Sequence, residues 1–309
     1  MKIAKLLAVA AILMGTPVGI NPVLGTDNVV VSIKPLHSLV SNVMHGAGQP
    51  HLLVHGTASP HIFSLKPSNA KRLREAKVIF WIGEILEAAL IKPIKTLGIQ
   101  ANLVTLSKLD GLKLLKARNS GLLDNKSHEN HNHAHNHSEI DGHLWLDPDN
   151  AKIFIDGIER AITTADPKNA NLYRKNSQRV RTRLRQISRE TENTLRPVKG
   201  RPFIVFHDAY QYFENRFDIP SVGSIVVDAN RPPGAKKIAA IKRKIQTVQA
   251  VCVFTEPQFS PKLATRLASN LKVRTGILDP LGANIEAGPE HYFRLMGSIA
   301  TNLASCLNR

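Results

Sequence analysis

No hydrophobic run in this chain of 309 residues approaches the roughly 20 apolar residues that a membrane-spanning helix requires. The apolar segment nearest the N-terminus covers Leu6–Met14 and follows Lys2 and Lys5. A positive start, a short apolar core and a small-residue cleavage site after Gly25 are typical of a secretory signal. We therefore expect residues 1–25 to be removed and the mature protein to be exported without spanning a membrane. An uncleaved anchor helix is the alternative.

Cysteine is scarce as well, because the chain contains only Cys252 and Cys306. Neither follows the apolar segment near the N-terminus, so no cysteine is placed for lipid attachment. This favours free residence in a periplasm over tethering to a membrane. In such an oxidising compartment the two cysteines are expected to form one disulfide, with two unpaired buried thiols as the alternative.

Aromatic residues make up only 5% of the chain, although its formal net charge is +17. Single-strand nucleic-acid binders stack bases on aromatic side chains, and this sequence offers no such platform. The basic residues are spread along the chain and are densest between residues 166 and 197. We interpret the charge as a solvated surface and expect no nucleic-acid partner. A basic adhesin or nucleic-acid binder that uses the Arg-rich segment is the alternative.

Short β-branched runs alternate with helical segments in two separate stretches of the chain. The expected strands are residues 29–33, 51–54, 78–81, 202–206, 224–227, 250–255 and 272–278. The expected helices are residues 34–40, 67–73, 84–90, 150–165, 209–217, 235–246, 261–270 and 290–307. This alternation predicts an α/β fold with two lobes built around parallel sheets.

One long helix is expected between the two stretches. Asp166 and Pro167 form a strong start signal, and neither glycine nor proline interrupts the chain again until Pro197. A helix of about 30 residues is about 45 Å long, which exceeds the width of one lobe and favours a rigid link between lobes. A coiled-coil partner helix is the alternative. The expected organisation is a signal peptide at 1–25, an N-terminal lobe at 26–165, a linker helix at 166–197 and a C-terminal lobe at 198–309.

A polar tract rich in histidine interrupts the N-terminal lobe and forms part of an expected mobile loop at residues 126–142. Its five histidines are His128, His131, His133, His135 and His137. Imidazole is the commonest protein ligand for transition metals, and tracts of this composition usually bind metal at least weakly. We expect accessory zinc binding here. A solvated loop without function is the alternative.

Four other residues that suit a metal stand at the ends of expected elements. His61 precedes a helix, His143 precedes an Asp-Pro turn, and His207 and Asp279 end strands. Ligands of open α/β sheets bind beyond the carboxyl ends of strands, so these side chains could converge between the lobes. Three imidazoles and one carboxylate complete a tetrahedral zinc shell. Spacing alone leaves ordinary core or turn histidines as an equal alternative.

Four motifs contain the three histidines or follow closely after one of them. They are Ser59-Pro60-His61, Lys66-Pro67-Ser68, Gly142-His143-Leu144-Trp145-Leu146-Asp147-Pro148 and His207-Asp208-Ala209-Tyr210. Together they resemble the ZnuA-type zinc-binding proteins of ABC importers, within the cluster A-I (cluster 9) solute-binding family. The resemblance covers essentially the whole mature chain. It implies two α/β lobes joined by one rigid helix, with the metal held between the lobes.

The resemblance also assigns roles at the site. His61, His143 and His207 would be ligands, and Asp279 stands where manganese-type relatives use an aspartate. Manganese-type members usually carry Glu at the place of His207, so a nitrogen ligand there favours Zn²⁺. Pro60 departs from zinc members that have an acidic residue before the first ligand. The fourth ligand would therefore be Asp279 or a water.

The resemblance implies a function too. Cys252 and Cys306 resemble the disulfide pair of the family's C-terminal lobe. The implied function is capture of Zn²⁺ in the periplasm by a monomer and its delivery to an ABC permease driven by a cytoplasmic ATPase. One alternative is the manganese-binding component of a related importer. The other is a secreted zinc hydrolase, although the chain has no H-E-x-x-H motif.

Overall fold

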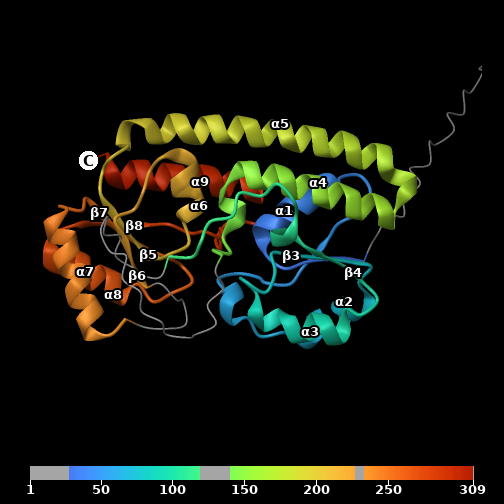
Figure 1. Cartoon of the computed structure of the whole chain (residues 1–309), viewed down its shortest axis with the longest axis horizontal. Helices are drawn as coiled ribbons and strands as arrows, with labels where there is room; N and C mark the ends of the chain where they lie inside the picture. Colours follow the sequence, from blue (N-terminus) through green and yellow to red (C-terminus); the bar gives the residue numbers. More distant parts are fainter. Residues whose placement is uncertain (1–27, 119–139, 227–232, 309) are drawn as a thin grey trace, which may run out of the picture.

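The computed structural model describes residues 28–118, 140–226 and 233–308. The expected signal segment and the histidine tract lie outside these described residues. Within the described ranges, no helix is both long enough and apolar enough to cross a membrane. Figure 1 shows two groups of strands side by side, with a long helix lying along both of them.

The N-terminal half contains a four-stranded parallel sheet in the order β2-β1-β3-β4. The strands are β1 (Val29–Val31), β2 (His51–Leu52), β3 (Val78–Trp81) and β4 (Asn102–Thr105). The helices are α1 (Lys34–Val43), α2 (Pro67–Glu75), α3 (Ile91–Leu97) and α4 (Pro148–Ala165). The central strands β1 and β3 are buried along their whole length, as expected for strands covered on both faces.

One expected helix of this half, at residues 84–90, is wrong. The α-helix begins only at Ile91, and a short 3-10 turn η2 (Ala88–Leu90) precedes it. The buried carboxylate of Glu87 accepts hydrogen bonds from the backbone N–H groups of Ile82 and Gly83, so it holds this stretch as a turn. No strand was predicted at β4, which is an edge strand whose side chains are exposed or half-buried.

The C-terminal half repeats the arrangement with a parallel sheet in the order β6-β5-β7-β8. Its strands are β5 (Phe203–His207), β6 (Gly223–Val226), β7 (Cys252–Thr255) and β8 (Arg274–Ile277). Its helices are α6 (Gln211–Phe217), α7 (Ala235–Thr247), α8 (Lys262–Leu271) and α9 (His291–Leu307). A disulfide between Cys252 and Cys306 joins β7 to α9, which confirms the expected pairing.

The long helix α5 (Ala170–Leu195) is flanked by the 3-10 turns η5 (Pro167–Asn169) and η6 (Arg196–Val198). It packs against α4 and α1 on one side of the molecule and against α9 and α6 on the other (Figure 1). The hydrophobic residues of its buried stripe are Tyr173, Val180, Leu184, Ile187 and Leu195. These side chains belong to one apolar cluster that runs through both halves. The expected linker helix is therefore present, and it is fixed to both halves along its length.

The loops at the carboxyl ends of the two sheets also meet. Trp145 donates its indole N–H to the carbonyl of Pro280 at 2.8 Å, and its own carbonyl accepts from Tyr292 at 2.8 Å. Lys34, at the start of α1, donates to the carbonyls of Ala283 at 2.7 Å and Ile285 at 3.0 Å. These bonds place the first half's loops directly against the second half's loops, where the expected ligands lie.

Candidate metal centre

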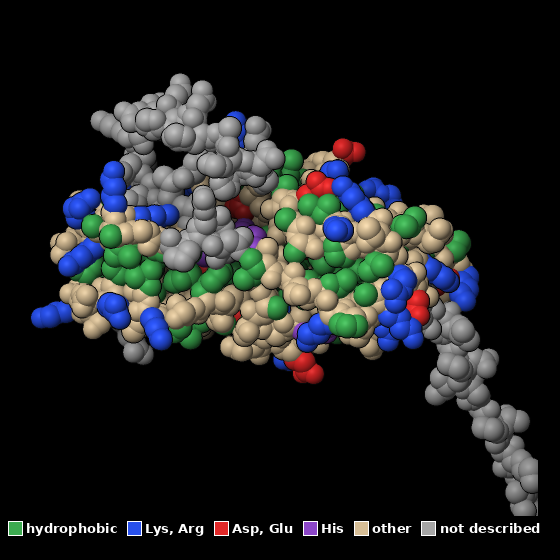
Figure 2. All heavy atoms as spheres, turned by 90° about the horizontal axis from the view of Figure 1, so that it is seen from below, with side chains coloured by type: hydrophobic (Ala, Val, Ile, Leu, Met, Phe, Trp, Pro, Cys, Tyr) green, Lys and Arg blue, Asp and Glu red, His purple; other side chains and the backbone are tan. Residues whose placement is uncertain are grey.

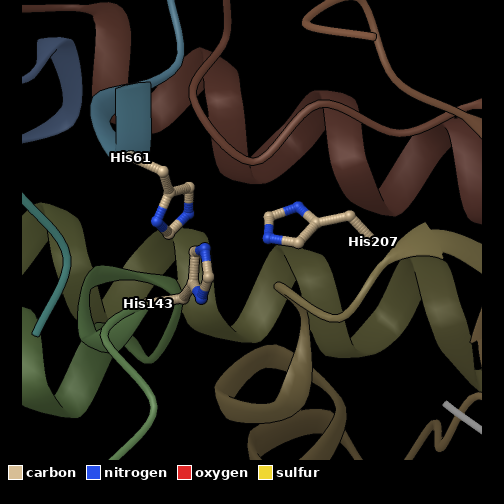
Figure 3. Close-up of side chains that lie close together, drawn as sticks. All are labelled: His61, His143 and His207. Carbon is tan, nitrogen blue, oxygen red and sulfur yellow. The ribbon is translucent and has the colours of Figure 1, made fainter. Parts of the chain in front are cut away.

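Three imidazole rings converge between the two halves (Figure 3). The ring centroids of His61 and His143 are 5.5 Å apart, those of His61 and His207 are 5.5 Å apart, and those of His143 and His207 are 5.0 Å apart. One nitrogen of each ring lies within 4.8 Å of the corresponding nitrogens of the other two. Three nitrogen donors at these separations can hold one metal ion after small adjustments.

Each histidine is placed by a different local structure. His61 is the middle residue of the 3-10 turn η1 (Pro60–Ile62), and its backbone N–H donates to the hydroxyl of Ser59 at 3.3 Å. His143 caps the 3-10 turn η4 (Leu144–Leu146), which leads into α4. His207 is the last residue of β5, at the carboxyl end of its sheet. The structure thus brings together three residues separated by 82 and 64 positions in the chain.

Two of the rings are oriented by buried carboxylates. Nδ1 of His143 lies 2.7 Å from Oδ1 of Asp141, and Nδ1 of His207 lies 3.2 Å from Oε2 of Glu256. A carboxylate only accepts, so the neutral imidazole donates its Nδ1 proton and keeps a lone pair on Nε2. Metal-binding histidines commonly carry such a partner, which fixes the tautomer and raises the basicity of the ligating nitrogen.

The third ring differs because no carboxylate among the described residues pairs with it in this way. Nε2 of His61 is buried and has no hydrogen-bond partner among the residues that the structure describes. Burial, together with the neighbouring rings of His143 and His207, lowers the pKa of His61 well below its ordinary value. His61 is therefore neutral at physiological pH and can offer a nitrogen lone pair to a ligand in the cavity. A metal ion would satisfy this buried atom.

His207 has the opposite electrostatic surroundings. Burial disfavours its charged form, but the charge and hydrogen bond of Glu256, helped by Asp208 and Asp141, outweigh that effect and raise the pKa of His207. The two acidic partners, Asp141 and Glu256, are themselves buried. Negative charge close behind the rings makes the space between them favourable for a cation.

The cavity between the rings is small. Its volume is about 10 Å³, close to what one water-sized particle occupies. The lining residues are Ser59, Pro60, His61, His143, Trp145, His207, Glu256, Gln258, Phe259, Pro280 and Leu281. The wall includes the rings of Trp145, Phe259 and two prolines, and a cavity of this volume suits an ion far better than an organic molecule.

Asp279, the fourth residue that the sequence suggested, does not join this group. It is absent from the cavity wall, and its two oxygens accept four hydrogen bonds. Three come from the backbone N–H groups of Leu281, Gly282 and Ala283 at 2.6–3.0 Å. The fourth comes from Nε2 of Gln258 at 2.7 Å. The carboxylate therefore stabilises the turn that follows it in the chain.

The remaining site expectations fall elsewhere. The accessory histidines His128, His131, His133, His135 and His137 lie outside the described residues. Sequence reasoning assigned no role at the site to Asp141, Glu256 or Gln258. A carboxylate two positions before His143 was a usable signal for Asp141, because short Asp-x-His spacing lets the side chain reach back to the ring.

The architecture and the site together define a class. Two parallel α/β halves joined by one long helix, with buried imidazoles between them, are the arrangement of metal-binding solute-binding proteins. The family model described as "ZnuA: Zinc-uptake complex component A periplasmic" matches residues 29–306. The chain belongs to this family.

Curated relatives agree with this assignment. The high-affinity zinc uptake system protein ZnuA of Brucella suis biovar 1 is 46% identical over 308 residues, covering 92% of this chain and 92% of the relative. The protein of the same name from Yersinia pestis is 32% identical over 308 residues, covering 96% and 95% of the two chains. The chain thus spans nearly the full length of these relatives.

Solved structures share the fold. A crystal structure of ZnuA matches with a TM-score of 0.76 at 23% identity, covering 91% of this chain and 98% of the other. A Mn-bound periplasmic metal-binding protein from candidatus liberibacter asiaticus matches with a TM-score of 0.74 at 20% identity, covering 90% and 99%. At such identities the likeness concerns the arrangement of helices and strands alone.

Proposed function

We propose that this protein binds one Zn²⁺ ion in the periplasm through His61, His143 and His207 and delivers it to an ABC permease driven by a cytoplasmic ATPase. The single observation that carries the proposal is the buried group of three imidazole nitrogens within 4.8 Å of one another. The zinc uptake names of the relatives at 46% and 32% identity support the choice of ion and of process.

Zinc is favoured over manganese by the donor set. Imidazole nitrogen suits Zn²⁺, whereas Mn²⁺ prefers carboxylate, carbonyl and water oxygens. Among the described residues, the group of possible ligand atoms at this point consists of three imidazole nitrogens and includes no carboxylate oxygen. Asp141 and Glu256 supply negative charge from behind the rings instead of supplying ligand atoms. A manganese carrier would be expected to bring at least one carboxylate to the ion.

A carrier is also favoured over a zinc hydrolase. Hydrolysis needs a metal with an open position, a general base and space for the substrate beside the ion. The cavity here holds about 10 Å³, so no peptide or ester group fits beside a bound ion. A site of this small volume suits an ion that is carried intact and released by a movement of the protein.

We propose no nucleic-acid partner for this protein. On the face drawn in Figure 2, Lys and Arg side chains are scattered over both ends, and histidine is visible in the middle between the two halves. We propose a soluble monomer of the periplasm that docks to its permease, with zinc as its cargo.

The test is a competition between the two ions. The protein is stripped with a chelator, dialysed and analysed for metal content, and then titrated with Zn²⁺ in the presence of a large excess of Mn²⁺. We expect one Zn²⁺ per chain, and a thousandfold excess of Mn²⁺ should fail to displace it. Preferential retention of Mn²⁺ would contradict the choice of ion.

A further inference from the structure

Gln258 lies between the Asp279 carboxylate and the cavity that holds the three imidazoles. Gln258 is one of the residues lining that cavity, whereas Asp279 lines a separate hollow beside β8 and α9. The two side chains are joined by a hydrogen bond of 2.7 Å from Nε2 of Gln258 to Oδ1 of Asp279. The expected fourth ligand is thus connected to the cavity wall through the side chain of Gln258 and through the backbone N–H of Leu281.

The direction of the Gln258 amide follows from its partner. Asp279 also accepts three backbone N–H groups, so its oxygens act as acceptors, and the amide must present its NH₂ group to them. The carbonyl oxygen, Oε1, is then turned away from Asp279. This oxygen is buried and has no hydrogen-bond partner in the part of the chain that the structure describes. An acceptor left unpaired in this way costs free energy unless it meets a donor or a cation.

Two residues that line the same small cavity, His61 and Gln258, therefore each carry a buried polar atom without a hydrogen-bond partner among the described residues, Nε2 and Oε1. A cation placed among the imidazoles would satisfy both. We infer that Gln258 supplies the neutral oxygen that completes the metal site, and that Asp279 acts on the ion only by holding Gln258 in this orientation. The inference rests on the proposed function, because it takes the ion at the three histidines to be Zn²⁺.

The contacts of Asp279 explain why its carboxylate does not line the cavity. To reach the cavity, its carboxylate would have to release the N–H groups of Leu281, Gly282 and Ala283 and open the turn after β8. That turn is also held by Lys34, whose ammonium group donates to the carbonyls of Ala283 and Ile285. Gln258 needs no such rearrangement, since its amide already lines the cavity.

The donor set has a consequence for selectivity. Three neutral imidazoles and one neutral amide oxygen place no anionic oxygen on the ion, which disfavours Mn²⁺ relative to Zn²⁺. Gln258 thus completes the donor set without bringing a carboxylate to the ion. Its loss would open the fourth position to water.

A double-mutant cycle tests the inference. Gln258→Leu removes both hydrogen-bonding atoms at similar volume, Asp279→Asn weakens the hold on Gln258, and the double variant combines them. Gln246→Leu, at an exposed glutamine on α7, is the matched control. Zinc affinity is measured by competition with a chromophoric chelator, and Co²⁺ is used as a spectroscopic probe because its visible bands depend on the donor set.

We expect Gln258→Leu to weaken zinc binding at least tenfold and to shift the Co²⁺ bands, while Gln246→Leu changes neither. Asp279→Asn should weaken binding in the wild-type background and have no further effect in the Gln258→Leu background. An unchanged affinity and Co²⁺ spectrum in Gln258→Leu would overturn the inference. So would an Asp279→Asn effect that persists in full without Gln258, because a direct ligand behaves in that way.

The cycle separates this inference from the proposed function. If the wild-type protein binds no zinc tightly, the proposed function fails. If it binds zinc through the histidines but Gln258→Leu binds equally well, only the role of Gln258 fails. Should Asp279→Asn not fold, Gln258→Leu alone decides through the affinity and the Co²⁺ bands.

Discussion

Nδ1 of His143 lies 2.7 Å from Oδ1 of Asp141, and the same carboxylate oxygen accepts the backbone N–H of His143 at 3.0 Å. One acidic side chain therefore fixes both the backbone and the ring of a residue that faces the cavity. Glu256 holds His207 in the same manner, with one oxygen on its backbone N–H and the other near Nδ1. In each half of the molecule, a buried carboxylate thus orients one imidazole ring towards the cavity.

The first prediction concerns Asp141. Asp141→Ala removes the acceptor that orients His143, and loss of such a partner typically weakens metal binding by about 10–100-fold. Asp141→Asn keeps an oxygen that can accept from Nδ1 and should lose less. Asp110→Ala, at an exposed aspartate, is the control. Chelator competition with Zn²⁺ measures the three affinities. Equal affinities for Asp141→Ala and Asp110→Ala would show that Asp141 does not position the ring.

A second prediction concerns the ion pairs that join the halves. Arg118 donates to Asp208 and to Glu214, and the side chains of these three residues are only 15%, 8% and 5% exposed. Arg118→Met leaves two buried carboxylates without their cation, so the free energy of unfolding should fall by about 3–5 kcal/mol.

The control for Arg118 is Arg183, which forms an ion pair with Glu290 at a more exposed position. Arg183→Met should cost about 1 kcal/mol or less in salt-bridge energy, because solvent screens exposed pairs. Urea denaturation of both variants at neutral pH measures the difference. A smaller loss for Arg118→Met than for Arg183→Met would mean that the buried network does not stabilise the fold.

A third prediction concerns pH and Glu87. Burial is the main cause that raises the pKa of Glu87 from 4.5 to about 7, despite hydrogen bonds from Ser32 and from the N–H groups of Gly83 and Ile82. The folded protein therefore keeps this proton between pH 4.5 and 7, where the unfolded chain has released it. The contribution of Glu87 to stability is greatest below pH 4.5 and is lost as the pH rises towards 7.

Glu87→Gln tests this linkage because the amide does not ionise. Relative to the variant, the free energy of unfolding of the wild-type protein should fall by up to about 3 kcal/mol as the pH rises from 4.5 to about 7. Denaturant unfolding at several pH values measures the difference, with Glu84→Gln at an exposed carboxylate as the control. A stability difference between wild type and Glu87→Gln that does not vary with pH would contradict the prediction.

A fourth prediction concerns the histidine tract, which lies outside the described residues. Deletion of residues 126–138 should leave one tight zinc site per chain and remove only weakly bound ions, because the converging imidazoles belong to other parts of the chain. Calorimetric titration with Zn²⁺ counts both classes of site. Loss of the tight site together with the tract would reverse the two assignments.

Much of the fold could be predicted from the sequence because the hydrophobic pattern changes period clearly. Buried runs such as Val78–Trp81 and residues 203–206 are short and apolar throughout, which is typical of parallel strands. The long helix was predictable from the start signal at Asp166-Pro167 and the absence of later breakers. The helix expected at 84–90 failed because a tertiary contact, the Glu87 carboxylate on backbone N–H groups, overrides local propensity.

The three histidines could be proposed from motifs, but their orientation could not. The partners Asp141 and Glu256 act over distances set by the folded backbone. The position of Asp279 was equally hidden. Its place at a strand end suggested a ligand. In the structure, both of its oxygens accept backbone N–H groups of the following turn, and Gln258 lines the cavity instead. Sequence spacing carries no information on which of two neighbouring polar groups faces inward.

The most direct test of the account is calorimetric titration of the chelator-stripped protein with Zn²⁺, compared with His61→Ala, His143→Ala and His207→Ala. His45→Ala, at an exposed histidine away from the site, is the control. We expect one tight zinc site per chain in the wild-type and control proteins, and a zinc affinity reduced by at least a hundredfold in each of the three variants. Undiminished affinity in these variants would contradict the claim that the three imidazoles hold the ion.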